Sequence, residues 1–479
     1  MEPINKAVFN WNSYPADILY LVFKLLSPPE HQALCLVNKY FRTIAERLLY
    51  SKIQFTWQKQ GGYSKLEDPP PITQLLLTLL SKPQLAAHIR SLHLDGKAYA
   101  LHATRFKLPK IHIPEDQLDE PIAFIHRTGV PYRDWWSREL HDGSVDALVA
   151  LLLAQLSSLK YLHLGCAFTR QSALTGIVLR SAICEPGTYK LGNFQHFREL
   201  SFIHCESRDE ACDRKVKNTL DILPFFYLPN LQHVSASIEN PDKWAWPAPH
   251  APVPPKLKSL DLTNIREGYL GEILAVTKNL QTLRWKWYYD SGVEDDFVTQ
   301  TVDLDQIAAA LSHVQGSLTD LAITADCQPA AAVGDQFFPG LEAVGSLRAL
   351  VNFDQIKTLQ IPLAFLVGFA QDRTKRLQDV IPRNIKFLTI TDDLALQNMD
   401  NMEEEWPAWE WKDYAILGLL ESWLREWTRW TLHLSRITLL LSWIDTDTNQ
   451  WSPRAREQLW GLSAQTGIPL EFVNTEHQL

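Results

Sequence analysis

The chain has 479 residues, 46% of them hydrophobic, and a formal net charge of −9 at pH 7. This hydrophobic fraction is ordinary for folded globular proteins and excludes a wholly disordered chain. The acidic balance argues against nucleic acid as a constitutive partner, because phosphate binding requires a basic surface. No apolar run approaches the roughly 20 residues of a membrane-spanning helix, so no membrane partner is expected.

Residues 11–50 predict three short amphipathic helices. The first begins at Pro15, a residue favoured at the start of a helix, with Asp17 near the positive helix end. Ser27 and Glu30 form the pattern of a capping box for the second helix, and Asn38 can cap the third. The apolar residues of the first helix repeat with the 3.6-residue period of one face: Ile18, Leu19, Val22, Leu25 and Leu26.

Helices this short cannot bury all of their apolar side chains among themselves. A unit below about 40 residues usually needs outside support to be stable. The surplus apolar surface therefore packs either on the rest of the chain or on a partner protein.

The order of residues from Pro15 to Phe41 resembles the F-box. The shared pattern is Pro15-x-Asp17-Ile18-Leu19, an apolar residue at Val22, Leu25-Leu26, and then Leu34-x-Leu36-Val37-Asn38-Lys39-x-Phe41. The family usually has Leu before the proline, where this chain has Tyr14. The resemblance covers a small N-terminal part of the chain. It implies docking on a Skp-type adaptor, which links F-box proteins to the cullin of a cullin–RING ubiquitin ligase.

The resemblance also implies which residues dock on the adaptor. Because the first and third helices must hold each other, some of these residues must instead form an internal core. The set is Pro15, Ile18, Leu19, Val22, Leu25, Leu34, Val37 and Phe41.

A helical connector is expected at residues 51–84, followed by a recurring pattern in residues 85–479. The pattern is an apolar residue, two positions, usually Leu, one position and another apolar residue. Each copy predicts a short strand, and helical stretches between copies imply parallel strands with right-handed crossovers. The copies lie at 89–94, 159–164, 197–202, 231–234, 257–262, 280–285, 318–323, 356–361 and 385–390.

The strands resemble the LxxLxL core of leucine-rich repeats. Two intervals between copies, 257 − 231 = 26 and 280 − 257 = 23 residues, match the roughly 20–29 residues of such repeats. Other intervals are longer and require insertions near 105–137, 240–256, 288–303 and 397–413. The expected fold is therefore α/β, with an N-terminal three-helix F-box-like module followed by an irregular leucine-rich-repeat-like solenoid with a parallel strand face.

The insertion near 397–413 is acidic and rich in tryptophan. Tryptophan is enriched at binding hot spots, and the glutamates at 403–405 would attract a basic partner, so this segment is a candidate client contact. The alternative is that the tryptophans fold back on the repeats while the glutamates keep the loop in solution. The candidate client-binding residues are Trp406, Trp409 and Trp411.

No pattern of an enzyme active site occurs. There is no Gly-rich phosphate loop, no GxSxG and no HExxH. The spacing of His204, Cys205 and Cys212 does not fit a zinc finger, and His163 with Cys166 is likewise not expected to bind a metal. No catalytic residue, metal or cofactor is therefore expected.

The six cysteines form no CxxC pair, and neither a signal-like N-terminal segment nor an Asn-x-Ser/Thr sequon occurs. Free thiols indicate a reducing compartment, so cytoplasmic or nuclear localisation is expected. None of the cysteines lies in a basic or histidine-rich context that would activate it to carry a ubiquitin thioester.

The predicted function is therefore that of a non-catalytic substrate receptor. By resemblance, the chain binds a Skp-type adaptor, and through it a cullin, with residues 11–50, and an unidentified client protein with the repeats. It would act by raising the effective concentration of the client near the charged ubiquitin carrier. Two alternatives remain: an F-box-containing interaction scaffold outside a ligase, and an enzyme on an α/β sheet.

Overall fold

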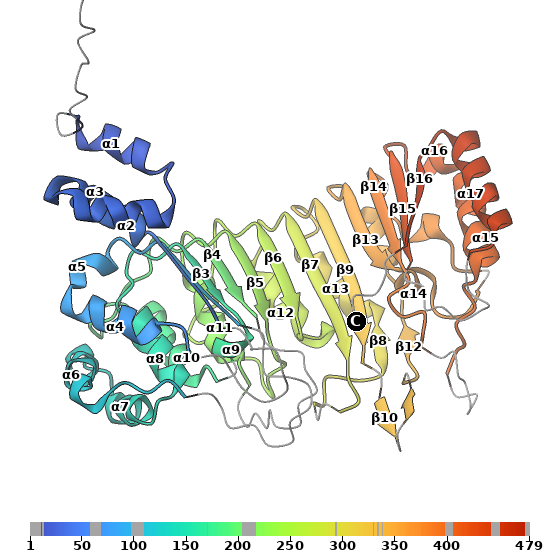
Figure 1. Cartoon of the computed structure of the whole chain (residues 1–479). Coiled ribbons are helices and arrows are strands. Elements are labelled where there is room, and N and C mark those ends of the chain that lie inside the picture. The colour runs from blue at the N-terminus through green and yellow to red at the C-terminus, as the bar shows by residue number, and fades with distance from the viewer. Residues whose placement is uncertain are drawn as a thin grey trace, which may run out of the picture. The chain divides into compact units, whose positions relative to one another are not determined.

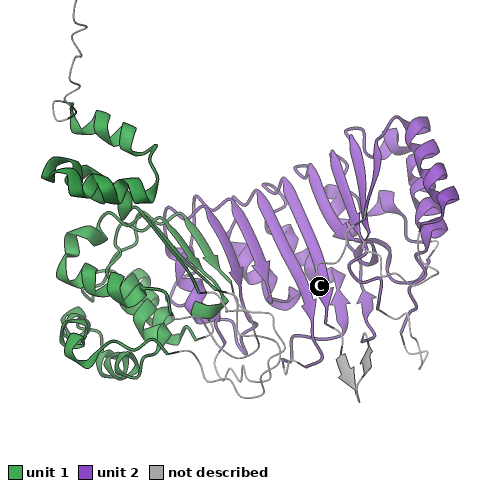
Figure 2. Ribbon diagram, viewed as in Figure 1, with its two compact units in different colours: residues 1–213 green, residues 214–479 purple. Residues whose placement is uncertain are grey.

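The computed structural model shows an α/β chain of parallel strands and helices (Figure 1). It contains two compact units, residues 1–213 and 214–479 (Figure 2). Among the described residues, no helix combines the length and apolar composition needed to cross a membrane. The described residues are 11, 14–57, 69–96, 110–169, 171–203, 217–292, 295–328, 330–332, 335–337, 339–372, 374–397, 406–441 and 451–474.

The three predicted N-terminal helices are confirmed. They are α1 (Ala16–Phe23), α2 (Pro28–Val37) and α3 (Lys39–Leu49). The predicted capping box at the start of α2 is present, because Ser27 N and Oγ both donate to Glu30 Oε2, at 2.6 and 2.7 Å. Asn38 caps α3 as expected: its Oδ1 accepts the backbone N–H of Phe41 at 2.8 Å.

The rest of the first unit combines parallel strands with helices. The predicted connector at 51–84 is wrong in its first part, which forms a strand, and the expected insertion at 105–137 is largely helical. The strands are β1 (Lys52–Trp57), β2 (Ser91–Gly96), β3 (Tyr161–Leu164) and β4 (Glu199–Phe202), in that order. The helices are α4 (Ile72–Ser81), α5 (Pro83–Ala86), η2 (Glu115–Gln117), α6 (Asp119–Thr128), α7 (Arg133–His141), α8 (Val145–Leu153), α9 (Cys166–Thr169) and α10 (Ala173–Cys184).

A buried carboxylate ties α8 to α10. Asp146, near the start of α8, accepts the backbone N–H groups of Leu174 and Thr175 at 2.7 and 2.9 Å. These N–H groups lie at the start of α10, where the helix itself leaves donors unpaired. Burial raises the pKa of the Asp146 carboxyl to about 6, although both hydrogen bonds act in the opposite direction.

We expect Asp146 to make the stability of the first unit depend on pH. Its pKa in the folded chain is above the ordinary value of 3.8, so the folded chain binds this proton more tightly than the unfolded chain. Stability from this group is greatest below about pH 4 and falls as the pH rises towards about 6. The Asp146→Asn variant has no titrating group at this position. Between about pH 4 and 7, the free energy of unfolding of the wild type in urea denaturation should fall by roughly 1–3 kcal/mol relative to that of the variant. A difference that is constant over this range would contradict the assignment.

The second unit has a longer series of parallel strands. Their order is β5 (His233–Ser237), β6 (Ser259–Thr263), β7 (Thr282–Tyr289), β9 (Asp320–Cys327), β13 (Thr358–Pro362), β14 (Phe387–Thr391), β15 (Arg436–Leu441) and β16 (Leu470–Asn474). Smaller pairs are β8 (Thr301–Asp303) with β12 (Glu342–Val344), and β10 (Ala330–Ala332) with β11 (Asp335–Phe337).

Helices and single turns connect these strands. They are α11 (Thr219–Ile222), η3 (Leu223–Tyr227), α12 (Glu267–Val276), α13 (Leu304–Ser312), η4 (Arg348–Asn352), α14 (Leu363–Val367), η5 (Leu377–Asp379), α15 (Asp413–Leu424), α16 (Trp427–Trp430) and α17 (Pro453–Thr466).

The predicted strand segments are confirmed, and they pair in parallel. Leu260 pairs with Val234 on one side and Leu283 on the other, so equivalent positions of successive copies lie side by side. These side chains are buried, whereas the alternate residue Asp261 is half-buried. Each strand therefore has one face in the core and one partly accessible face, as the period of two predicts.

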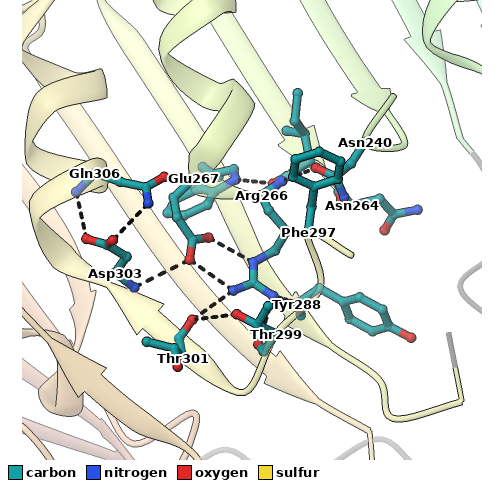
Figure 3. A network of polar contacts seen from close by, with 12 residues as sticks. Asn240, Asn264, Arg266, Glu267, Tyr288, Phe297, Thr299, Thr301, Asp303 and Gln306 are labelled. Carbon is teal, nitrogen blue, oxygen red and sulfur yellow. Dashed lines mark hydrogen bonds and ion pairs between the residues drawn. The ribbon is translucent and has the colours of Figure 1, made fainter. Parts of the chain in front are cut away.

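The connection from β6 to α12 is built around a buried arginine (Figure 3). Both Arg266 and Glu267 are buried, and Nε and Nη2 of the arginine donate to the two carboxylate oxygens at 2.8 and 2.9 Å. The remaining guanidinium donors bind the carbonyls of Tyr288, Thr299 and Thr301 at 3.0–3.3 Å. All five N–H donors of the guanidinium are thus used, which a buried arginine requires.

Arg266→Met should destabilise the second unit strongly. The substitution removes the arginine donors from the Glu267 carboxylate and three carbonyls and leaves a buried carboxylate without its counter-charge, which we expect to cost about 3–5 kcal/mol in chemical denaturation. Arg376→Met is the matched control, because Arg376 pairs with Asp379 at 3.1 Å on the surface and should contribute less than about 1 kcal/mol. Equal effects of the two substitutions would contradict the structural role of Arg266.

Candidate functional site

Helices α1–α3 have a small hydrophobic core of their own. It consists of Leu19, Phe23, Phe41, Ile44 and Leu48, with Leu26 and Leu34 packed against it. The rings of Phe23 and Phe41 lie 5.3 Å apart in an edge-to-face arrangement, which joins α1 to α3. His31 Nε2 donates to the carbonyl of Phe23 at 2.8 Å and attaches α2 to the end of α1.

Many apolar side chains of this module remain outside its core. Ten of the nineteen large hydrophobic residues that are exposed in the described part of the chain lie between Trp11 and Tyr40, so they are concentrated there rather than scattered. Leu25 and Leu36 are each 86% exposed, and Leu21 and Val37 are about 60% exposed. Concentrated apolar exposure of this kind is typical of a surface that binds another protein.

Seven of these exposed residues lie in two groups, which together we call the docking face. On α1 and the turn after it, the stripe follows helical spacing, at positions 18, 21, 22 and 25. A second part lies at the junction of α2 and α3, where Tyr40 Oη donates to the carbonyl of Tyr14 at 2.8 Å and so lies beside the start of α1. The docking face comprises Ile18, Leu21, Val22, Leu25, Leu36, Val37 and Tyr40.

The structure divides the predicted adaptor-binding residues into two sets. Pro15, Ile18, Val22, Leu25 and Val37 are exposed and available to a partner. The other three are not on the docking face: Leu19 and Phe41 are core residues, and Leu34 is half-buried against that core. Their assignment as contact residues is corrected accordingly.

Leu36 is the most informative residue that the sequence-based set omitted. It is as exposed as Leu25 and lies directly before Val37. The F-box-like pattern includes this position, so the pattern itself was the available signal. Leu21 and Tyr40 were also omitted, and Leu21 is not among the residues that the sequence placed on the single apolar face of the first helix.

The predicted client-binding tryptophans fold back on the second unit. Trp411 is buried, and its Nε1 donates to the carbonyl of Gly368 at 2.7 Å. The half-buried ring of Trp409 lies edge-on to Phe369, with centroids 6.2 Å apart. The Trp406 ring occupies the space where a Cβ at Gly340 would lie. The client-contact hypothesis is therefore wrong for Trp411, and Glu403–Glu405 lie outside the described residues.

The structure also brings together a group of side chains that could bind a metal. Within the described part of the chain, His93, Asp95 and His163 are the one such group of three or more. Their donor atoms all lie within 4.8 Å of one another, on strands β2 and β3. The sequence interpretation had considered His163 only with Cys166, while His204, Cys205 and Cys212 lie outside the described residues.

Comparison with known proteins gives no family for the chain: no protein-family model matches it, and no curated protein does. The site is therefore interpreted from its own geometry. The docking face presents aliphatic side chains on helices that a separate small core holds in place. Such a face can bury the apolar surface of another protein, with the hydrophobic effect as the driving force.

Substitutions in α1 and α2 should separate core from docking face. Leu19→Ala leaves a cavity in the core of α1–α3 and should lower the stability of these helices by about 2–5 kcal/mol. Their backbone amides should therefore exchange hydrogen faster than in the wild type. Leu36→Ala shortens an exposed side chain. The opening free energy derived from hydrogen exchange of the α1–α3 amides should therefore change by less than about 0.5 kcal/mol. Equal protection in the two variants would contradict this division.

Proposed function

We propose that the chain is a substrate-recognition subunit of a cullin–RING ubiquitin ligase that docks on a Skp-type adaptor through the docking face of α1–α3. The exposed aliphatic surface of these helices carries the proposal, because folding leaves it in contact with water. The F-box-like order of residues from Pro15 to Phe41 supplies the identity of the partner.

The distribution of burial supports this assignment. Leu19, Phe23 and Leu26 follow one stripe of α1 and serve the core, whereas Ile18, Val22 and Leu25 follow another and are exposed. A helix that served only the fold of this chain would need one apolar stripe. The second stripe would contribute to binding when a partner covers it, because burying one aliphatic side chain fully is favourable by about 1.5–3 kcal/mol.

Client binding is assigned to the accessible face of the parallel strands. Trp411 of the acidic Trp-rich segment is part of the fold and provides no aromatic anchor for a client. The alternate residues of each strand remain partly accessible along both units. A client held there would be presented to the charged ubiquitin carrier, and the chemistry would take place on other subunits.

Leu25→Asp combined with Leu36→Asp should abolish adaptor binding. Both side chains are 86% exposed, so the chain should fold normally, but each carboxylate would be desolvated at the interface at a cost of several kcal/mol. We expect the affinity of the purified full chain for a Skp-type adaptor to fall at least 100-fold in calorimetry. Leu432→Asp is the matched control, since Leu432 is 67% exposed in the second unit and should leave binding unchanged.

Two outcomes would change the proposal. Unchanged adaptor affinity in the double variant, with a normal melting temperature, would show that the docking face is not the adaptor site. Adaptor binding that is lost in the double variant, but without any adaptor-dependent ubiquitination of co-purified proteins by the wild type, would identify an interaction scaffold outside a ligase.

A further inference from the structure

We propose that His93, Asp95 and His163 form a binding site for Zn²⁺, or for a divalent first-row ion of similar ligand preference, on the accessible strand face of the first unit. Imidazole nitrogen and carboxylate oxygen are ligands that suit zinc. The site is independent of the docking face and of the function proposed for it.

The topology of the sheet places the three ligands on one face. His93 on β2 pairs directly with His163 on β3. Asp95 follows His93 by two residues, and because side chains alternate along a strand it points to the same side. The intervening Leu94 is buried on the opposite side, together with its partner Leu164. The three candidate ligands are half-buried, so an ion can reach them from solvent.

The distances require only a small adjustment for metal binding. The donor atoms lie within 4.8 Å of one another, and His163 Nε2 is 3.7 Å from Asp95 Oδ1. Ligand bonds of about 2.0–2.2 Å in a tetrahedral zinc site place donors roughly 3.4 Å apart. The two imidazole rings are stacked, with centroids 4.0 Å apart and planes inclined by 11°. Turning the rings out of this stack would close the donors around one ion.

Neighbouring residues orient the candidate ligands. Ser201 on β4 pairs with His163, and its Oγ lies 2.8 Å from His163 Nδ1. When Nδ1–H donates to this hydroxyl, Nε2 keeps its lone pair on the side of Asp95, which is the arrangement that metal-binding histidines use. Gly165 makes room for Asp95, because a Cβ there would come within 2.7 Å of Oδ1.

Binding of Zn²⁺ to the chelator-treated full chain tests the site. We expect one Zn²⁺ per chain in competition with a chromophoric chelator. His93→Ala and His163→Ala should each weaken this binding at least tenfold. His196→Ala is the matched control, since His196 is exposed in the same unit and is not one of the candidate ligands. Zn²⁺ should also raise the melting temperature of the wild type and of the control, but not of the other two variants.

A substitution that keeps all three ligands provides an independent test. Gly165→Ala should displace the Asp95 carboxylate and weaken Zn²⁺ binding, although no donor atom is removed. His163→Gln keeps a polar group near Ser201, so it replaces His163→Ala if that variant fails to fold. The proposal is overturned if the wild type does not bind Zn²⁺ below millimolar concentration, or if the folded His93 and His163 variants bind it as tightly as the control.

Discussion

Every second side chain is buried in most of the parallel strands, and the core of both units depends on this alternation. Leu92 and Leu94 of β2 enter the core, while His93 between them reaches the accessible face. Because successive strands pair in register, a property of one strand repeats in the next, so His93 meets His163 and His163 meets Ser201. The pattern that builds the core therefore also aligns the polar rows from which binding sites on the other face are made.

The N-terminal helices divide their apolar residues between a core and an exposed surface. Their own core is small, and the apolar residues that it does not use lie together on the docking face. In a chain with so much apolar surface buried elsewhere, this concentration is the strongest indication of function. The candidate metal ligands lie on β2 and β3, and the docking face lies on the N-terminal helices, so the two proposed sites share no residue.

Local features could be predicted from the sequence, and long-range ones could not. The capping box of Ser27 and Glu30 involves neighbouring residues, and the strand segments follow a period of two. The contact of His93 with His163 depends on which strands pair, and the hydrogen bond of Trp411 to Gly368 joins residues 43 positions apart. Helix α6 lies in the segment that was expected to be an insertion, and its Pro121 stands in the first turn, where proline is tolerated. The period in α1 predicted a single apolar face, which is wrong: Leu19 and Leu26 serve the core, whereas Ile18, Val22 and Leu25 are exposed.

The arginine network has a consequence for how the second unit can vary. Arg266 is bound by carbonyls that follow it by 22 to 35 residues in the chain, on both sides of the segment between β7 and β8. An insertion or deletion in that segment is compatible with the fold only if Thr299 and Thr301 return to the guanidinium. The length of the segment can therefore change, but its last residues must keep their position beside Arg266. Such changes would alter the protein surface and leave the buried network unchanged.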